Sequence, residues 1–149
     1  MRDQVHQAVA EQRVDELERL VEANPRAVRF LVGLTYHQDA ARRETACRGV
    51  ALAARYHPKL IRSVINRLVT AMAGEGGNYG ATAPAVLTAI AGERPELLAP
   101  VVPDLLQATT DPEMQPEVAT CLQLVAKACP DLVSGHMKAL INAPTGRDN

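Results

Sequence analysis

Side chains that could carry catalysis are scattered along this sequence. The histidines are His6, His37, His57 and His136, and only His37 has a carboxylate close by, that of Asp39. An aspartate just before a helix commonly caps that helix, so this pair predicts a capped turn rather than an acid–base site. The sequence also lacks the metalloprotease, nucleophile-elbow, phosphate-loop and dinucleotide-binding motifs. We therefore expect no enzyme activity, no cofactor and no metal site.

The cysteines give no sign of a reactive site. Cys47, Cys121 and Cys129 are odd in number and form no C-x-x-C motif. A zinc or redox centre would need clustered cysteine or histidine partners. A thiol in an apolar helical position behaves as a small apolar side chain. We expect buried, structural cysteines.

Positive charge is concentrated in the middle of the chain. Residues 26–67 contain eight arginines and one lysine against two acids, which gives +7. Residues 1–25 carry three basic and six acidic side chains, or −3, and residues 68–149 carry four and nine, or −5. One interpretation is a docking ridge for an acidic partner, formed by Arg42, Arg48, Arg55, Lys59 and Arg62. The other is a solvated face, or one that pairs with the acidic neighbouring helices.

The composition favours an all-α fold. Apolar residues make up 47% of the chain, but Ala, Leu and Val dominate, with one Phe, three Tyr and no Trp. Small side chains of this kind suit closely packed helices, whereas sheets favour aromatic and β-branched residues. No apolar run reaches the length of about 18 residues that a membrane helix needs, and the N-terminus is charged. We expect a cytoplasmic protein with no membrane segment.

The chain contains one pattern that occurs three times. Stretches that begin at Ala46, Ala83 and Val118 superpose without a gap. Their shared proline occurs at Pro58, Pro95 and Pro130. A fourth, weaker copy is centred on Pro25, so that successive prolines are 33, 37 and 35 residues apart. Such spacings are typical of a helical-hairpin repeat.

Apolar periodicity, proline positions and capping residues predict the helices. They cover about residues 5–22, 25–36, 39–56, 58–73, 79–92, 95–109, 111–128 and 130–141. Asn24 and Asp39 are N-cap candidates. Pro100 and Pro103 should make helix 95–109 start late, kink or break. Residues 143–149 are predicted to be a frayed tail, which leaves one domain over residues 1–142.

The register of helix 39–56 separates an apolar face from a basic one. At about 100° per residue, Ala46, Val50 and Ala53 point the same way, and Arg48 and Arg55 point the opposite way. We expect the first three residues to be buried and the two arginines to face solvent. Reversal of both arginines to glutamate is then predicted to leave the melting temperature nearly unchanged.

The longest break in the pattern is Gly74-Glu75-Gly76-Gly77-Asn78. Three glycines in four residues give this segment unusual backbone freedom. It is interpreted either as a hinge or contact loop or as a solvated turn that accommodates a longer repeat. Asn78 and Tyr79 are the second candidate position for partner contacts.

The proline-marked hairpins resemble the HEAT repeat. Asp39-x-x-x-Arg43-x-x-Ala46 is similar to the aspartate and arginine of a HEAT second helix, and Pro95-Glu-Leu-Leu-Ala-Pro-Val-Val-Pro-Asp-Leu-Leu looks like a HEAT first helix. The resemblance covers nearly the whole chain and is closest to compact prokaryotic HEAT-like proteins, with HEAT and armadillo-like subtypes both open. It implies a right-handed α-solenoid of about four hairpins and a structural role for Arg43, bonding across a turn.

Stacked hairpins expose a broad helical surface, and such surfaces bind partners. The expected function is therefore a non-enzymatic scaffold or adaptor that binds another protein. The alternative is nucleic-acid binding through residues 26–67. HEAT-like alkylpurine DNA glycosylases share the expected architecture but rely on aromatic residues, so a chain without Trp is not expected to have their activity. Monomer and homodimer are both compatible with the sequence.

Overall fold

A computed structural model describes residues 1–73, 78–112 and 115–131 of the chain, with the backbone alone described at 73 and 78–81. Every regular element in these ranges is helical, which confirms the all-α prediction. The elements are α1 (Arg2–Ala10), α2 (Val14–Ala23), α3 (Arg26–Leu34), α4 (Ala40–Tyr56), α5 (Pro58–Ala73), α6 (Asn78–Glu93), the 3₁₀ helix η1 (Pro95–Val101), α7 (Val102–Ala108) and α8 (Gln115–Ala128).

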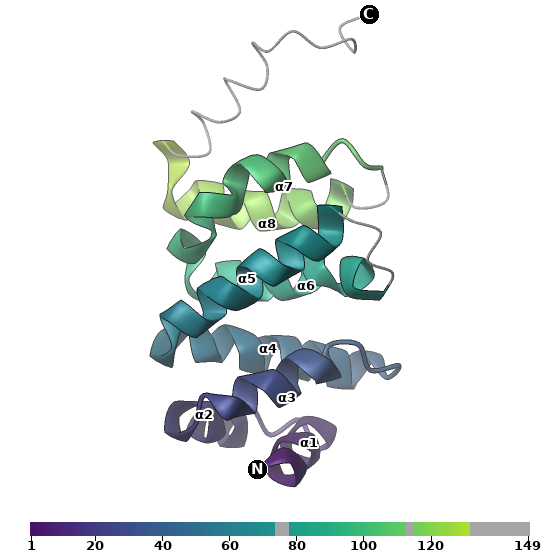
Figure 1. The fold of residues 1–149 in the computed structure, drawn as a ribbon, viewed down its shortest axis with the longest axis vertical. Helices are drawn as coiled ribbons and strands as arrows, with labels where there is room; N and C mark the ends of the chain where they lie inside the picture. The colour runs from purple at the N-terminus through teal and green to yellow at the C-terminus, as the bar shows by residue number, and fades with distance from the viewer. Residues whose placement is uncertain (74–77, 113–114, 132–149) are drawn as a thin grey trace, which may run out of the picture.

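The helices follow one another along the long axis of the molecule in two rows (Figure 1). In the first row, here called the α4 row, α4 packs between α2 and α6, and α6 packs on α8. The second row, here called the α5 row, contains α3, α5, η1 and α7. There α3 packs on α4 and α1, while α5 packs on α6, α4 and η1. Each helix thus contacts the helices that are near it in the sequence.

The expected capping residues act at the starts of α3 and α4. The Asp39 carboxylate accepts a hydrogen bond from the Arg42 backbone N–H at 3.2 Å. The Asn24 side-chain oxygen accepts one from the Arg26 N–H at 2.9 Å. These side chains satisfy N–H groups that have no partner inside the helix, so they fix where each helix begins.

The single helix predicted over residues 5–22 is wrong, because α1 ends at Ala10 and α2 begins at Val14. Between them, Gln12 has a φ of 56°, in the left-handed region. The Arg13 N–H donates to the Ala8 carbonyl at 2.8 Å and closes the end of α1. A left-handed residue at this position is usually glycine, and a glutamine gives no such signal in the sequence. The chain therefore turns back, and α1 and α2 pack against each other.

Proline divides the segment 95–109 as expected. The 3₁₀ helix η1 ends at Val101, and α7 follows from Val102. Pro100 and Pro103 lack the N–H group that an α-helix interior requires, so a continuous helix would lose hydrogen bonds there. The two short pieces still bury one apolar side, which includes Leu97, Leu98 and Val102.

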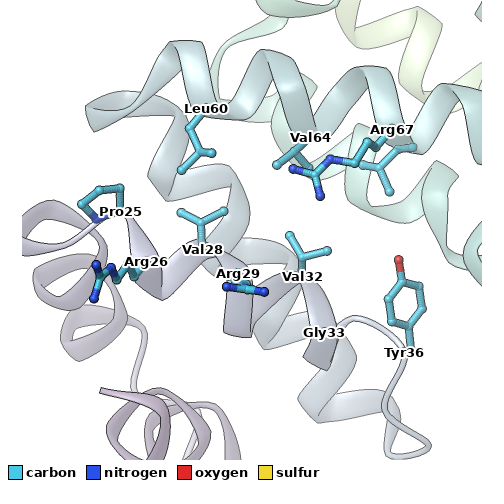
Figure 2. Close-up of a pocket in the computed structure, with 11 residues that line it drawn as sticks. Pro25, Arg26, Val28, Arg29, Val32, Gly33, Tyr36, Leu60, Val64 and Arg67 are labelled. Carbon is cyan, nitrogen blue, oxygen red and sulfur yellow. The ribbon is translucent and has the colours of Figure 1, made fainter.

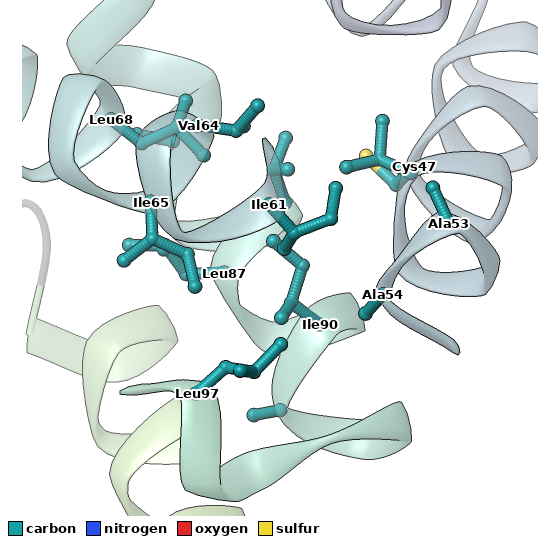
Figure 3. Close-up of a cluster of buried hydrophobic side chains, with 14 of the residues drawn as sticks. Cys47, Ala53, Ala54, Ile61, Val64, Ile65, Leu68, Leu87, Ile90 and Leu97 are labelled. Carbon is teal, nitrogen blue, oxygen red and sulfur yellow. The ribbon is translucent and has the colours of Figure 1, made fainter. Parts of the chain in front are cut away.

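One hydrophobic core runs through both rows, and Figure 3 shows its middle. Equivalent positions of the sequence repeat occupy equivalent buried places. Ala53, Ile90 and Val125 are each fully buried on α4, α6 and α8. Val50 and Leu87 are also fully buried, one repeat apart. The proline-based alignment therefore identified the core positions of these three helices.

The buried cysteines are part of this packing. Cys47 and Cys121 are buried, and Cys129 is half-buried. Burial raises the pKa of both the Cys47 and the Cys121 thiols to about 11. Both side chains thus stay neutral near pH 7 and act as small apolar groups.

Several expectations fall where the structure gives little or nothing. Residues 74–77, most of the predicted helix 130–141 and the predicted tail 143–149 lie outside the described residues. Within the described ranges, no helix combines the length and apolar character needed to cross a membrane. The His, Cys, Asp and Glu side chains of these ranges form no group of three that could hold a metal ion.

Candidate functional site

The five basic residues predicted to form a ridge lie on two different rows. Arg48 and Arg55 project from the exposed side of α4, opposite the buried Ala46, Val50 and Ala53, as the register predicted. Lys59 and Arg62 are exposed on α5, in the other row. Arg42 lies in the first turn of α4, where it pairs with Asp39 at 3.8 Å. The five side chains thus come from two helices in different rows, and their role in partner binding stays a prediction.

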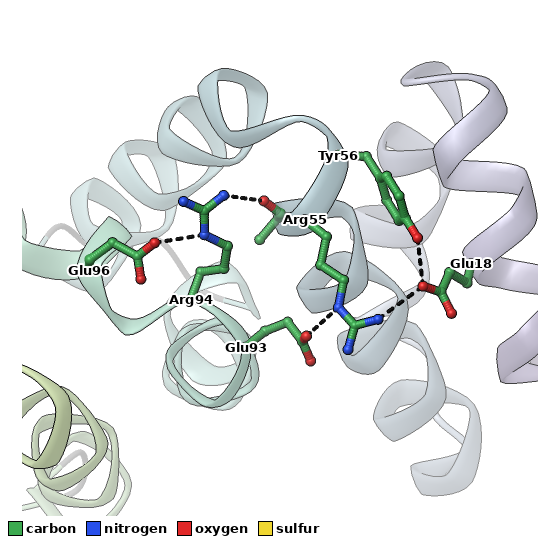
Figure 4. Close-up of polar contacts among 7 residues, drawn as sticks. Glu18, Arg55, Tyr56, Glu93, Arg94 and Glu96 are labelled. Carbon is green, nitrogen blue, oxygen red and sulfur yellow. Dashed lines mark hydrogen bonds and ion pairs between the residues drawn. The ribbon is translucent and has the colours of Figure 1, made fainter.

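Arg55 links three helices of the α4 row (Figure 4). Its guanidinium donates to the Glu93 carboxylate on α6 and, at 3.0 Å, to Glu18 on α2. The Tyr56 hydroxyl donates to the same Glu18 oxygen at 2.7 Å. Glu18, Arg55, Tyr56 and Glu93 are called the Arg55 network below. One of the two interpretations of the basic residues was that they pair with acidic neighbouring helices. Arg55 forms such pairs.

The electrostatics of the Arg55 network follow from these contacts. The hydrogen bond from Tyr56 lowers the pKa of Glu18, and the charge of Arg55 lowers it further. The same hydrogen bond raises the pKa of Tyr56. The hydrogen bond to Glu93 raises the pKa of the Arg55 guanidinium. Glu18 and Arg55 are therefore held in their charged forms at neutral pH, while Tyr56 stays protonated.

Arg94 forms a second contact between repeats beside this network. It donates to the Ala54 carbonyl at the end of α4 at 3.3 Å and to Glu96 at 2.7 Å (Figure 4). A bond to the last turn of α4 satisfies a carbonyl that has no partner inside the helix. Arg94 therefore joins α4 to the start of η1.

His37 and Asp39, the only close pair of a histidine and a carboxylate in the sequence, lie in the turn between α3 and α4. The His37 Nδ1 atom accepts a hydrogen bond from the Asp39 N–H at 2.9 Å. Arg43 donates to the His37 and Gln38 carbonyls, both at 2.8 Å. His37 and Asp39 are thus engaged in forming the turn, and Arg43 bonds across it as predicted.

A groove lies between α3 and α5, in the α5 row (Figure 2). It encloses about 650 Å³. Its apolar walls are formed by Val28, Val32, Leu60, Val64 and Leu68. Arg26, Arg29 and Arg67 lie beside these walls, with Pro25 at one end and Tyr36 at the other.

The groove exists because α3 and α5 each pack inward. The buried side of α3 contacts α4 and α1, and the buried side of α5 contacts α6 and α4. Gly33 adds to the open space, since a Cβ at this position would meet nothing within 4 Å. Val28 and Val64 are buried, while Val32 and Leu60 are half-buried. The apolar surface between the two helices thus remains partly exposed at Val32 and Leu60.

Positive charge lies along the groove, and the two helices that form it contain no acid. Arg26, Arg29 and Arg67 are exposed, and none takes part in an ion pair within the described parts of the chain. Residues 25–38 and 58–73, which include all of α3 and α5, contain no Asp or Glu. With Lys59 also exposed on α5, the surface attracts anionic groups.

Sequence reasoning did not identify the groove. It counted Arg26, Arg29 and Arg67 in the basic segment but named none of them as a site residue. The available signal was the absence of any acid from both helices. For Asn78 and Tyr79, the other predicted contact residues, the backbone begins α6, and their side chains lie outside the described part.

Comparison of the chain with protein-family models, with curated proteins and with solved structures gave no significant match.

Proposed function

We propose that this chain is a protein-interaction module, a small HEAT-like scaffold or adaptor that binds a partner protein through the outer surface of its helices. The observation that carries the proposal is the groove between α3 and α5, which combines partly exposed apolar walls with exposed arginines. Apolar surface that a partner can cover is typical of protein-binding grooves. The module acts by binding and needs no catalytic group.

The α-solenoid architecture is part of this proposal. Its support is the arrangement of the α4 row, in which α2, α4, α6 and α8 pack in succession. Further support is the burial of repeat-equivalent residues such as Ala53, Ile90 and Val125. In a solenoid each hairpin buries its apolar face only against its neighbours, which leaves an extended outer surface for binding.

Duplex nucleic acid is the second candidate partner. It is favoured by the acid-free outer side of α3 and α5, where Arg26, Arg29, Lys59, Arg62 and Arg67 are exposed. Binding of this kind depends on phosphate contacts, so it should weaken steeply between about 50 and 200 mM salt. The apolar walls of the groove offer nothing to a phosphate backbone, and for this reason we place protein binding first.

The protein-binding proposal is tested by cross-linking in the cell of origin. Tagged protein at its natural level is treated with an amine-reactive cross-linker and purified. Lys59 lies on α5 beside the groove, and Lys127 lies on α8 in the other row. We expect a partner peptide bonded to Lys59 and none bonded to Lys127. Recovery of the chain without any cross-linked partner would contradict the proposal.

A further inference from the structure

We propose that the α3/α5 groove binds a short, acidic, amphipathic helix of the partner protein. This inference rests on the proposed function and specifies which chemistry the partner presents. It follows from the shape of the groove, from its apolar walls and from the position of its arginines.

The shape of the groove suits a helix. The groove follows α3, whose nine residues extend over about 14 Å at 1.5 Å per residue. Two neighbouring helices with a gap between them can accept a third helix as a ridge in a groove. A partner helix of about three turns would cover the length from Pro25 to Tyr36.

The walls of the groove define the apolar side of the ligand. Leu60 lies opposite Val28, and Val32 lies opposite Val64 (Figure 2). Val32 and Leu60 are only half-buried, so a ligand would complete their burial. Each Å² of apolar surface that the ligand buries would favour binding by about 25 cal/mol. Anchors at positions i, i+3, i+4 and i+7 of a helix lie on one side, as this surface requires. Leu, Ile, Met or Val fits between these aliphatic walls.

The arginines define the polar side of the ligand. Arg26 lies toward the Pro25 end of the groove, and the guanidinium groups of Arg29 and Arg67 lie on opposite sides of its middle, so the three do not converge on one point (Figure 2). A single small anion would contact only one or two of them. Several carboxylates along a helix can each pair with a guanidinium, which binds carboxylates with two parallel hydrogen bonds. The ligand is therefore acidic beside its apolar stripe.

The test uses synthetic peptides and measures fluorescence anisotropy. Labelled peptides of about 14 residues carry Leu, Ile, Met or Val at the four anchor positions and Glu or Asp elsewhere. Each has a scrambled version with the same composition but no apolar stripe. A labelled DNA duplex of about 20 base pairs serves as the nucleic-acid probe. We expect at least one patterned peptide to bind about tenfold more tightly than its scrambled version, because scrambling removes the anchors that fill the groove.

Two glycines provide a matched pair of variants. A Cβ at Gly33 or at Gly92 meets nothing within 4 Å, so a side chain can begin at either position without a clash. Gly33 lines the groove, whereas Gly92 is exposed on α6 and lies outside it. We expect Gly33→Trp to weaken binding of the patterned peptide at least about tenfold, because the indole fills the groove. Gly92→Trp should leave binding unchanged.

A charge variant keeps the proposal testable if Gly33→Trp fails to fold. The double variant Arg29→Glu with Arg67→Glu should weaken binding of the patterned peptides about tenfold or more, since two attractive charges become repulsive. Lys127→Glu, at an exposed position of α8 in the other row, is the control and should have no effect. Circular dichroism and the melting temperature show that each variant is folded.

Three outcomes would overturn the inference. Scrambled acidic peptides could bind as well as patterned ones, which would indicate attraction without a groove. DNA could bind more tightly than any peptide and be unaffected by Gly33→Trp. The third outcome is that none of the peptides binds, whereas the natural partner still binds the Gly33→Trp variant. In that case the proposed function stands and only the groove assignment fails. If the wild-type chain has no partner at all, the proposed function itself fails.

Discussion

At the scale of single residues, the two arginines on the exposed side of α4 have different surroundings. Arg48 is exposed and pairs with nothing in the described parts of the chain. Arg55 pairs with Glu18 and Glu93, which come from helices on either side. The sequence placed both on the same face but gave no sign of this difference, because the partners of Arg55 are 37 and 38 residues away.

The first prediction separates these two arginines. Arg48→Glu should change stability by no more than about 0.5 kcal/mol, as is usual for an exposed position. Arg55→Glu should lower the melting temperature clearly, since it places a third carboxylate between Glu18 and Glu93. This revises the expectation that reversal of both residues is harmless. Thermal unfolding followed by circular dichroism measures both, and equal effects of the two changes would count against the network.

The second prediction concerns the pH dependence of Glu18. Its pKa is lowered from an ordinary value of 4.5, so the ionised form is stabilised in the folded state. The contribution to stability is then present above the unfolded pKa and is lost as pH falls through the folded pKa. Glu18→Gln should therefore unfold at a lower temperature than wild type at neutral pH. The difference should shrink as the pH falls below 4.5.

The control for this measurement is Glu44→Gln, at an exposed position of α4 that has no ion pair in the described residues. The melting temperature of Glu44→Gln should differ little from that of wild type, both near pH 7 and near pH 3. If the melting temperature of Glu18→Gln is as far below that of wild type near pH 3 as near pH 7, then the charge of Glu18 is not what stabilises the network.

At the scale of elements, α3 and α4 approach closely at a glycine. A Cβ on Gly49 would lie 2.9 Å from both terminal carbons of Leu31, which is fully buried. Small residues on α4 therefore allow α3 to pack tightly against it. Gly33, on the groove side of α3, meets no such neighbour. The same substitution should thus have opposite effects at the two positions.

The third prediction follows from this contrast. Gly49→Ala should destabilise the fold by about 1–3 kcal/mol, because the added methyl group overpacks the core against Leu31. Gly33→Ala should stabilise it by about 0.4–1 kcal/mol, because alanine restricts the unfolded chain and fits the open space. Urea denaturation gives both values. Stabilisation by Gly49→Ala would show that α3 and α4 are less tightly packed than described.

The sequence was most informative about elements that follow simple periodicity. The proline-based alignment located the buried positions of α4, α6 and α8, and Pro100 and Pro103 correctly marked a broken helix. It missed the turn at Gln12, because a non-glycine residue adopts a left-handed conformation there. Glutamine has no strong local preference for this conformation, so no residue pattern predicted the turn.

At the scale of the whole molecule, charge is unevenly distributed among the helices. The net charge is only −1, yet α3 and α5 contain no acid. Ion pairs join α2, α4 and α6 where these helices meet. Charge counts along the sequence detected the basic segment but not this distribution. Periodicity shows which side of each helix is buried, whereas a groove depends on how far apart two packed helices lie. That spacing is a property of the tertiary structure.

The most direct test of the central claim is a map of the binding surface. The amide signals of the isotope-labelled chain are recorded by two-dimensional NMR while the tightest-binding acidic amphipathic peptide is added. We predict that the shifted signals cluster in α3 and α5, around Arg29, Val32, Leu60 and Arg67, which line the groove. Shifts that cluster around Arg48 and Arg55 on α4, with α3 and α5 unchanged, would contradict the account and return the binding surface to the opposite row.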